Sequence, residues 1–379
     1  MKEDKHILLD LLGHDTQNSN RQGFASTNQA LNSVAEILSY AGVKVEFQDY
    51  TVDSGNGQQV ARKNLVAKLE ENAELPTVGL QGHIDTVPFG DYGGNPLGEK
   101  EGGRIYGRGA VDMKASLASM IYVMMRAPGM ANLAVNPRLI ITSDEEAHSF
   151  AGIKRFLEDN PPIDFAICGE PTGMQVVDRG KGAISAVIDV FGKSGHGSRP
   201  YQGENAIVKA LPLLNDLAAL SSGIRYVTNP DFESSDSYSH RSSMNIGRIQ
   251  AGETVNVIPA QLRIELEMRC VQPSDKYLAL LEETMAPHRD LVGAYNVVFA
   301  HDPMRVQLDK DSPLCGKVLM LSNESGVFNG FSEAVLLNDT GIPTIVYGVC
   351  DSRMCHSSQE YVDIADLKAY TQKLTDFIS

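Results

Sequence analysis

The sequence predicts an α/β fold that is interrupted by a second unit. Segments with the period of strands alternate with segments with the period of helices over 1–178 and again over 303–379. This alternation is typical of a sheet covered by helices, with functional groups gathered at the strand ends. Between these stretches the order is β-α-β-β-α-β, which is the ferredoxin-like arrangement. We therefore expect a discontinuous main domain, 1–178 with 303–379, and an inserted domain, 179–302.

The first long helix of the main domain should begin with a capping box and end at a glycine. Ser26 and Gln29 have the spacing of the box, Leu31 and Leu38 have helical spacing, and Gly42 should close the helix. Segment 43–50 alternates as a half-buried strand. Further strands are expected at 64–70, 76–85, 138–146 and 340–349, and further helices at 112–127, 150–160 and 363–378.

The inserted domain should contain four strands and two helices. Strands are expected within 183–196, 242–252, 253–270 and 294–300, and helices at 204–220 and 274–288. The polar segment 229–243 contains many serine and aspartate residues and is the best candidate for a mobile loop.

Composition excludes several classes of partner. The 379 residues carry a net charge of -15, which argues against binding to nucleic acid or to an anionic membrane surface. No stretch approaches the ~20 apolar residues of a membrane span, and the charged N-terminal segment lacks a signal-peptide pattern. The five cysteines are scattered without a CxxC pair, as in reduced proteins. We expect a cytoplasmic protein with neither nucleic-acid nor membrane partners.

Several candidate metal ligands follow predicted strands. His83 and Asp85 lie two residues apart, so both side chains point to one face of a strand end. The pair is either a buried histidine satisfied by an acid, or a metal ligand with a carboxylate behind it. Asp112 stands directly before a helix, where it could also be a helix cap.

Glu145 and Glu146 end one apolar strand, Glu170 ends another, and His356 lies in a polar loop. Each has an ordinary explanation when it is taken alone. Together with His83 and Asp112 they supply two imidazoles and four carboxylates, which suits two divalent ions, and histidine favours zinc. Hydrolysis at such a site needs a bridging ligand and an uncoordinated base. Asp112 could bridge, and one member of the Glu145–Glu146 pair could be the base.

Six segments, in order along the chain, carry a resemblance to a known family. They read GHIDTVP, GRGAVDMK, DEE, GEPT, GKSGHGSRPYQGENAI and VNVIPAQLRIELEMR. In this order they resemble the M20 family of zinc aminoacylases and exopeptidases. Within the family the chain is most similar to the acetylornithine deacetylases, with the succinyl-diaminopimelate desuccinylases close behind. One reason is Glu333 in GFSEAVLL, where many relatives have aspartate.

The resemblance implies a zinc-exopeptidase-like catalytic domain and a set of metal ligands. His83 and Glu170 would hold one zinc ion, Glu146 and His356 would hold the other, and Asp112 would bridge them. Two zinc ions per subunit are implied, and cobalt could substitute for them.

It also implies roles for residues outside the ligand set. Glu145 would be the general base and Asp85 would orient His83, while the peptide bond between Asp112 and Met113 is often cis in relatives.

In the inserted domain, which would act as a lid and dimerisation domain, His196 would reach the partner subunit's site and stabilise the oxyanion. Asn256 and Arg269 match positions that bind the substrate carboxylate or polarise its carbonyl. An arginine fork suits a carboxylate. The ordinary alternative for His196 is a histidine in a turn, and the ordinary alternative for Arg269 is a charged side chain on the surface of a strand.

Two departures from the family pattern are visible. Ala115 stands where relatives usually have glycine, which should matter little. Cys355 precedes His356 at a variable place, where a small filler is preferred over a metal ligand.

These features predict a homodimeric amidohydrolase that acts on an N-acyl amino acid with a free carboxylate, with N-acetylornithine as the first candidate. Alternatives that use the same machinery are a desuccinylase, a dipeptidase or carboxypeptidase, and a hydrolase of a specialised N-acyl metabolite. A non-catalytic binding protein on the same fold is the remote alternative, because binding alone would not need Glu145.

Overall fold

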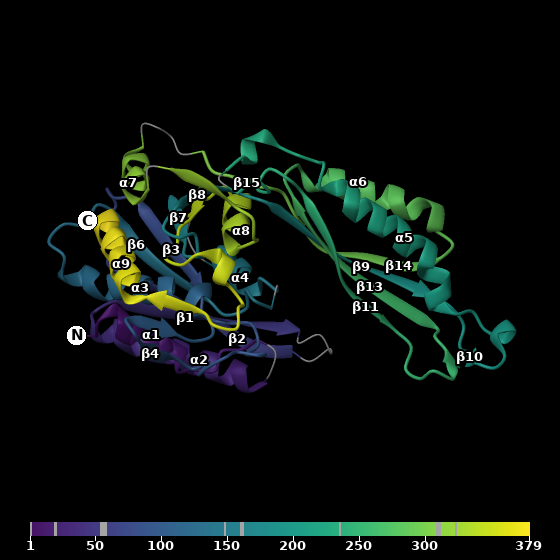
Figure 1. The fold of residues 1–379 in the computed structure, drawn as a ribbon. Coiled ribbons are helices and arrows are strands. Elements are labelled where there is room, and N and C mark those ends of the chain that lie inside the picture. The colour runs from purple at the N-terminus through teal and green to yellow at the C-terminus, as the bar shows by residue number, and fades with distance from the viewer. Residues whose placement is uncertain are drawn as a thin grey trace. The chain divides into compact units, whose positions relative to one another are not determined.

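The computed structural model describes residues 2–18, 21–53, 59–147, 149–159, 163–234, 236–307, 312–322 and 324–379. The chain divides into two compact units. Unit 1 comprises Met1–Asp178, Val306–Gly326 and Ser332–Ser379, and unit 2 comprises Arg179–Arg305 and Val327–Phe331. Figure 1 shows the elements of each unit.

Unit 1 is built on a mixed sheet whose central strands are parallel. Its order is β1 (Lys44–Asp53), β2 (Gln59–Lys68), β6 (Asn136–Thr142), β3 (Thr77–His83), β7 (Phe165–Cys168), β17 (Thr344–Val346) and β8 (Val176–Gly180). Strand β3 runs parallel to both β6 and β7, and β17 runs parallel to β7. The residues of β6 and β7 are buried throughout, as expected for strands covered on both faces.

Helices cover the sheet of unit 1. Helix α3 (Ala115–Arg126) packs against α1 (Asp4–Leu12), α2 (Arg21–Tyr40) and α9 (Ile364–Ile378), and α4 (Ala151–Asp159) packs against α8 (Glu333–Asp339) (Figure 1). Helix α7 (Pro313–Leu321) also packs against α9. A small sheet is formed by β4 (Glu99–Glu101), β5 (Arg104–Tyr106) and β18 (Tyr361–Asp363).

The predicted start of the first long helix is wrong. Helix α2 begins at Arg21, so Ser26 lies inside it and not at a capping box. The aromatic ring of Phe24 lies 4.0 Å below the guanidinium of Arg62, which anchors the extra N-terminal residues of the helix. The predicted end is confirmed, since Gly42 follows the helix with a φ of 85°.

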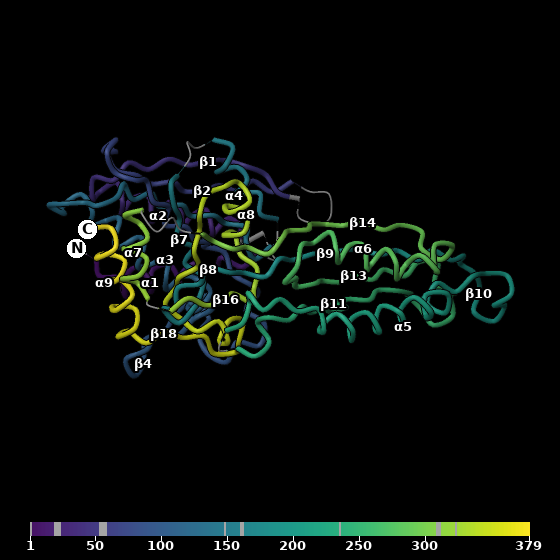
Figure 2. Tube along the Cα trace, turned by 90° about the horizontal axis from the view of Figure 1, so that it is seen from above, coloured from purple at the N-terminus to yellow at the C-terminus, as the bar shows by residue number. Residues whose placement is uncertain are grey.

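Unit 2 has the predicted β-α-β-β-α-β order. Its elements are β9 (Gly182–Phe191), α5 (Ala206–Ile224), β11 (Ser243–Ala251), β13 (Gln261–Cys270), α6 (Ser274–Met285) and β14 (Val292–His301). The antiparallel sheet has the order β11-β13-β9-β14, so β11 and β14 are its edges (Figure 2). Both helices pack on one face, over a core that includes Ile184, Ile188, Leu213, Leu266 and Tyr277.

The boundaries of unit 2 differ from the expected 179–302. The unit runs to Arg305, and it also takes in Val327–Phe331, from near the end of the chain. Within it the backbone N–H of Lys181 donates to the carbonyl of Phe328 at 3.1 Å. The ring of Phe331 lies 5.8 Å from that of Phe299. Contacts between segments so far apart along the chain leave no periodic signal in either of them.

Among the described residues one helix, α5, is long and apolar enough to cross a membrane by length and composition, although we expected no such stretch from the sequence. Lys209, Pro212 and Asp216 interrupt its apolar run. One side of the helix belongs to the core of unit 2, whereas Val208 and Leu211 on the other side are 62% and 50% exposed. The core packing identifies α5 as an element of unit 2, and its composition alone is weak evidence for a membrane span.

Candidate metal centre

The register of three parallel strands brings the predicted ligands of unit 1 to one edge of its sheet. In this register His83, the last residue of β3, lies beside Thr142, the last residue of β6, and Gln81 lies beside Cys168, the last residue of β7. The chain leaving β6 carries Glu145 and Glu146, and the chain leaving β7 carries Glu170. This is the edge at which α/β proteins assemble their sites.

Two further ligand candidates come from irregular segments of unit 1. Asp112 lies in the turn Ala110–Lys114 that leads into α3, and its peptide bond to Met113 is cis, as the family resemblance implied. His356 follows the short turn Ser352–Met354 with a φ of 59°.

The buried carboxylate of Glu360 holds the turn that carries Asp112. It accepts hydrogen bonds from the backbone N–H groups of Gly109 at 3.0 Å and Val111 at 3.2 Å, and it pairs with the guanidinium of Arg108. Glu360 was not predicted from the sequence, because a single acid in a polar loop has no distinguishing pattern.

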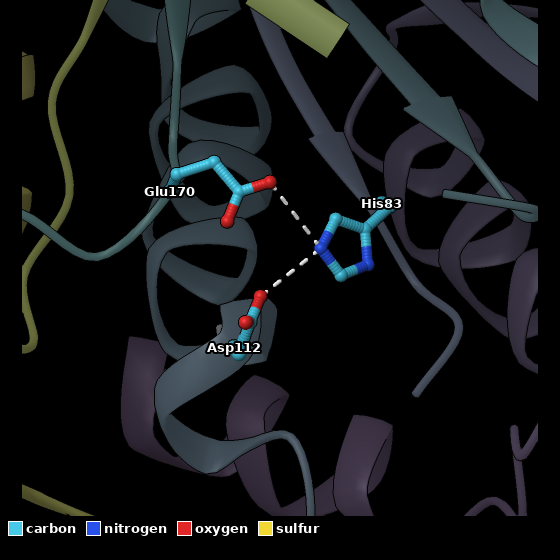
Figure 3. Close-up of side chains that lie close together, drawn as sticks. All are labelled: His83, Asp112 and Glu170. Carbon is cyan, nitrogen blue, oxygen red and sulfur yellow. Dashed lines mark hydrogen bonds and ion pairs between the residues drawn. The ribbon is translucent and has the colours of Figure 1, made fainter. Parts of the chain in front are cut away.

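The candidate ligands form two trios that share Asp112. The first contains His83, Asp112 and Glu170, and the second contains Asp112, Glu146 and His356. In the first, Nε2 of His83 lies 3.2 Å from Oδ1 of Asp112 and 3.5 Å from Oε1 of Glu170 (Figure 3). In the second, Nε2 of His356 lies 3.4 Å from Oδ2 of Asp112 and 3.1 Å from Oε1 of Glu146. The two oxygens of Asp112 therefore face different imidazoles.

Hydrogen bonding fixes the ring of His83. Its Nδ1 lies 3.0 Å from the backbone carbonyl of Asp85 and 3.6 Å from the carboxylate of the same residue. A proton on Nδ1 satisfies the carbonyl, which leaves the lone pair on Nε2 for a metal ion.

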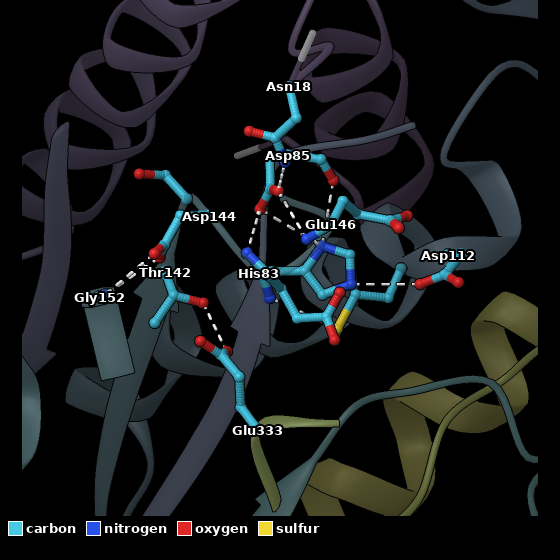
Figure 4. Close-up of polar contacts among 12 residues, drawn as sticks. Asn18, His83, Asp85, Asp112, Thr142, Asp144, Glu146, Gly152 and Glu333 are labelled. Carbon is cyan, nitrogen blue, oxygen red and sulfur yellow. Dashed lines mark hydrogen bonds and ion pairs between the residues drawn. The ribbon is translucent and has the colours of Figure 1, made fainter. Parts of the chain in front are cut away.

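The carboxylate of Asp85 is fully buried and ties the two strand ends together (Figure 4). It accepts hydrogen bonds from the backbone N–H of Glu145 at 3.3 Å and of Glu146 at 3.0 Å, and also from the side-chain amide of Asn18. The guanidinium of Arg62 donates to Oδ1 of Asn18 at 2.6 Å and to the carbonyl of Ser143 at 2.7 Å.

Neither Asn18 nor Arg62 was predicted from the sequence as part of the site. Arg62 is 2% exposed although it occupies a strand position that reads as ordinary surface charge.

The carboxylates of the site raise each other's proton affinity. Burial and the charge of Asp112 raise the pKa of Glu146 and that of Glu170 to about 7 each. Burial also raises the pKa of Glu145 well above its ordinary value, although His83 opposes this effect.

The two histidines lie in a strongly anionic environment. Burial lowers the pKa of His83, but hydrogen bonds with Asp112 and Glu170 outweigh it and raise this pKa well above 6.5. Hydrogen bonds with Asp112 and Glu146 raise the pKa of His356 to about 10. A divalent transition metal ion would offset the negative charge of this cluster, and imidazole and carboxylate groups are suitable ligands for it.

The match to a family model adds an independent observation. The model for Peptidase family M20/M25/M40 matches residues 79–379, which is most of the chain. The chain belongs to this family. Its members are metal-dependent hydrolases of amide bonds, so the protein is a metal-dependent amidohydrolase.

Relatives and solved structures agree with the M20 assignment. The chain is 32% identical over 358 residues to the acetylornithine deacetylase of Proteus mirabilis (strain HI4320), covering 89% of this chain and 86% of the relative. It is 27% identical over 393 residues to the succinyl-diaminopimelate desuccinylase of Rickettsia bellii (strain RML369-C), covering 96% and 94%. The M20 metallo-carboxypeptidase Sso-CP2 from Sulfolobus solfataricus shares the fold, with a TM-score of 0.78, 18% identity and coverage of 100% and 99%.

Glu145 differs from the other acids of this M20 site. It is 6% exposed and lies in neither of the two trios found among the described residues, whereas the adjacent Glu146 belongs to one. The two members of the Glu145–Glu146 pair, which their residue types alone left equivalent, therefore differ in the structure. Burial also raises the pKa of the Cys355 thiol, so this residue is an uncharged thiol at neutral pH.

The predicted residues of unit 2 fall into two places. His196 in β10 (Gly195–His196) is exposed, and it pairs with Val257 of β12 (Val257–Ile258), next to Asn256. The carbonyl of Asn256 accepts a hydrogen bond from the N–H of Gly197 at 2.8 Å, so His196 and Asn256 lie together.

Arg269 lies at the other end of β13 and forms an ion pair with Glu267. From Gln261, the first residue of β13, to Arg269 the strand extends roughly 27 Å. The structure therefore brings His196 and Asn256 together but not Arg269.

Proposed function

We propose that this M20-family enzyme removes the acyl group from an N-acyl amino acid with the help of two zinc ions. His83 and Glu170 would hold one ion, Glu146 and His356 would hold the other, and Asp112 would serve both. The two oxygens of Asp112, each facing the imidazole of a different trio, are the observation that carries this proposal. Two imidazole nitrogens among carboxylate oxygens fit zinc, and cobalt should substitute.

When bound, the metal pair supplies Lewis acidity and lowers the pKa of water. The chain supplies the proton transfers. Glu145 lies outside both trios, so its carboxylate is free to take a proton from the attacking water and to deliver it to the leaving amine. Asp85 keeps Glu145 and Glu146 in place through their backbone N–H groups, and it positions His83 beside them.

The relatives suggest the substrate class. Those named acetylornithine deacetylase make N-acetylornithine the first candidate, and those named succinyl-diaminopimelate desuccinylase make an N-succinyl amino acid the second. A dipeptidase or carboxypeptidase remains the runner-up reaction. A carboxypeptidase and a dipeptidase are among the solved structures, but at 18% and 14% identity they support the fold alone.

The substrate test is a screen with metal-free protein reloaded with zinc or cobalt. We expect hydrolysis of N-acetyl or N-succinyl amino acids, loss of activity with a chelator, and recovery with either metal ion. Cleavage of dipeptides alone would favour the runner-up. Full activity in protein shown by elemental analysis to be metal-free would overturn the proposal.

We also propose that the enzyme is a homodimer in which His196 completes the partner's site. His196 and Asn256 lie in the β10–β12 ribbon, which precedes β13, whereas Arg269 lies near the far end of β13, roughly 27 Å from its first residue. One small substrate is therefore not expected to contact all three residues of one chain. Edge strand β11 and the exposed apolar side of α5, including Val208 and Leu211, are surfaces that a second copy would bury.

Subunit mixing tests this arrangement. His196→Ala and Glu145→Ala, each nearly inactive, are unfolded and refolded together. Half of the dimers should be mixed and one site in each should be intact, so about a quarter of all sites should recover. The control is a mixture of His196→Ala with the variant that carries both His196→Ala and Glu145→Ala. No dimer in this mixture can form an intact site. No recovery, with subunit exchange confirmed, would place His196 within its own site or outside catalysis.

A cytoplasmic location is part of the proposal. All five cysteines are free in the structure, as expected for a reducing compartment.

A further inference from the structure

Arg62 is one of three arginines that are buried among the described residues, and it differs from the other two. Arg108 and Arg138 each pair with a carboxylate, that of Glu360 and that of Glu71. Within the described ranges no carboxylate forms an ion pair with Arg62, which donates instead to two uncharged oxygens. A buried guanidinium without a counterion has lost hydration that neutral acceptors replace only in part. An ion pair that stabilises the fold therefore does not explain this arginine.

The two oxygens that accept from Arg62 lead to the segment that follows β6 and carries the acid pair of the metal centre. We call this segment, residues 143–146, the exit segment. One oxygen is the carbonyl of Ser143, at 2.7 Å, and it belongs to the exit segment itself. The other is Oδ1 of Asn18, at 2.6 Å. The first contact is a direct hold on the exit segment, and the second is the start of an indirect one.

The side-chain amide of Asn18 has one orientation that suits both of its neighbours. A guanidinium only donates hydrogen bonds, and an ionised carboxylate only accepts them. Oδ1 of Asn18 faces Arg62, and the amide nitrogen donates to Oδ2 of Asp85 (Figure 4). Rotation of the amide by half a turn would place donor against donor and acceptor against acceptor. Arg62 therefore fixes the end of Asn18 that Asp85 meets.

The carboxylate of Asp85 returns this connection to the exit segment. Its Oδ2 accepts from the backbone N–H of Glu146 at 3.0 Å, and its Oδ1 accepts from that of Glu145 at 3.3 Å. The oxygen that Asn18 binds is thus the oxygen that holds the backbone of Glu146. Hydrogen bonds linked in series in a buried environment strengthen one another. Arg62 therefore holds the exit segment twice, directly at a carbonyl oxygen and indirectly at two N–H groups.

The position of Arg62 in the sheet distinguishes this role from general support of the fold. Strands β2 and β6 are antiparallel with Leu65 opposite Ile141, so Arg62 lies beyond the end of β6, at the level of the exit segment. Arg138 is equally buried, at 2% exposed, but it lies near the start of β6. From there to the exit segment the strand extends roughly 17 Å. Arg138 is therefore a matched control for the loss of a buried arginine from this sheet.

We propose that Arg62 is a positioning residue of the metal centre, which holds the exit segment so that Glu146 can bind metal and Glu145 can act as the base. The inference rests on the proposed function, and it adds the residue that fixes the acid pair. The first trio is held in another way, because the ring of His83 is fixed by the backbone carbonyl of Asp85. Loss of Arg62 should therefore weaken the second trio more than the first.

Cobalt titration of the metal-free full-length protein, followed by the visible absorption of the bound ion, tests the effect on the ligands. Arg62→Met removes the donors with little change in side-chain length. One of the two ions should bind at least ~10-fold more weakly, as is typical when a partner behind a ligand is lost. In a His356→Gln background, which disables the second trio, Arg62→Met should change the affinity of the remaining ion less than about threefold.

Hydrogen exchange in the metal-free protein tests the hold on the backbone directly. Arg62→Met should speed exchange in peptides that cover the exit segment at least ~10-fold, because its N–H groups lose their fixed acceptor. Arg138→Met should lower stability in urea but leave both the exchange of the exit segment and the cobalt affinities as in the wild type. If Arg62→Met does not fold, Arg62→Lys keeps the charge and reaches one of the two oxygens, so its effects should be intermediate.

The exchange measurement needs no metal, so it separates this inference from the proposed function. A wild type that binds no cobalt but loses protection of the exit segment in Arg62→Met would overturn the proposed function, while the hold of Arg62 on the segment stands. Cobalt affinities in Arg62→Met that equal those of the wild type, or changes of the same size in Arg138→Met, would overturn the positioning role and leave the proposed function intact.

Discussion

Replacement of Glu333 by glutamine should make the protein progressively more stable than the wild type as pH rises. The carboxyl group of Glu333 is 1% exposed at the start of α8. Its Oε2 accepts hydrogen bonds from the amide of Gln81 and from the hydroxyl of Thr142, the latter at 2.6 Å. Its Oε1 is buried, and no group of the described residues is hydrogen-bonded to it, so this is where a proton would sit. Glutamine reproduces this protonated form, with an amide group in place of Oε1.

The sign and the magnitude follow from proton linkage. Burial and the charge of Asp144 raise the pKa of Glu333 well above 4.5 in the folded chain. A group whose folded pKa is raised contributes stability that is present below its unfolded pKa and is lost as pH rises toward the folded value. The loss is about 1.4 kcal/mol per pH unit in that window. Over two pH units within that window the wild type should therefore lose about 2.7 kcal/mol relative to Glu333→Gln.

Urea denaturation of both proteins in the presence of a chelator, at pH 5.5, 6.5 and 7.5, measures this difference. Other titrating groups are common to both proteins and cancel in the comparison. Glu333→Ala is the control. It removes the hydrogen-bond acceptor, so it should be less stable than Glu333→Gln at every pH. A difference between the wild type and Glu333→Gln that does not change with pH, or that shrinks as pH rises, would show that the buried carboxylate is ionised and would refute the reasoning.

Glu145→Gln should lower turnover at least ~10²-fold with its metal content near that of the wild type, as measured by steady-state kinetics and elemental analysis; loss of metal here and its retention in Glu146→Gln would reverse the two roles. Arg269→Lys should not restore the activity that Arg269→Ala loses, because a point charge lacks the fork, and esters of the α-carboxylate should be poor substrates of the wild type; equal rates on acid and ester would remove Arg269 from that role. Gly348→Ala should destabilise unit 1 by about 1–3 kcal/mol, because its Cβ would lie 2.3 Å from the backbone carbonyl oxygen of Glu170; an unchanged melting temperature would contradict this packing.

Local patterns predicted the parts of the site that are continuous in sequence. The strand leading to His83, the apolar run before Glu145 and the glycine-rich turn at Asp112 each have a signature within a few residues, and register then brings them together. The ferredoxin-like order of unit 2 was predictable for the same reason, since each of its elements has a clear period.

The residues that support the site were not predictable, because their roles depend on distant partners. Arg62 lies on β2 and reads as a surface charge until Asn18 and Ser143 are placed beside it. The role of Glu360 becomes visible only when the backbone N–H of Gly109, which donates to its carboxylate, is placed beside it. The predicted start of α2 was wrong because the N-terminal part of the helix is held by the contact between Phe24 and Arg62, which lies on a strand more than thirty residues later.

The insertion of unit 2 within unit 1 has a consequence for the order in which the chain can fold during synthesis. Nearly all of unit 2 is continuous from Arg179 to Arg305, so its sheet and helices can form as soon as that stretch leaves the ribosome. Strand β17, which completes the central part of the unit 1 sheet beside β7, is translated afterwards, and His356 follows it. Until β17 has been made, one edge of β7 is unpaired. Until His356 has been made, the second ligand trio is incomplete. The second trio, and with it the complete metal centre, can therefore form only once nearly the whole protein has been made.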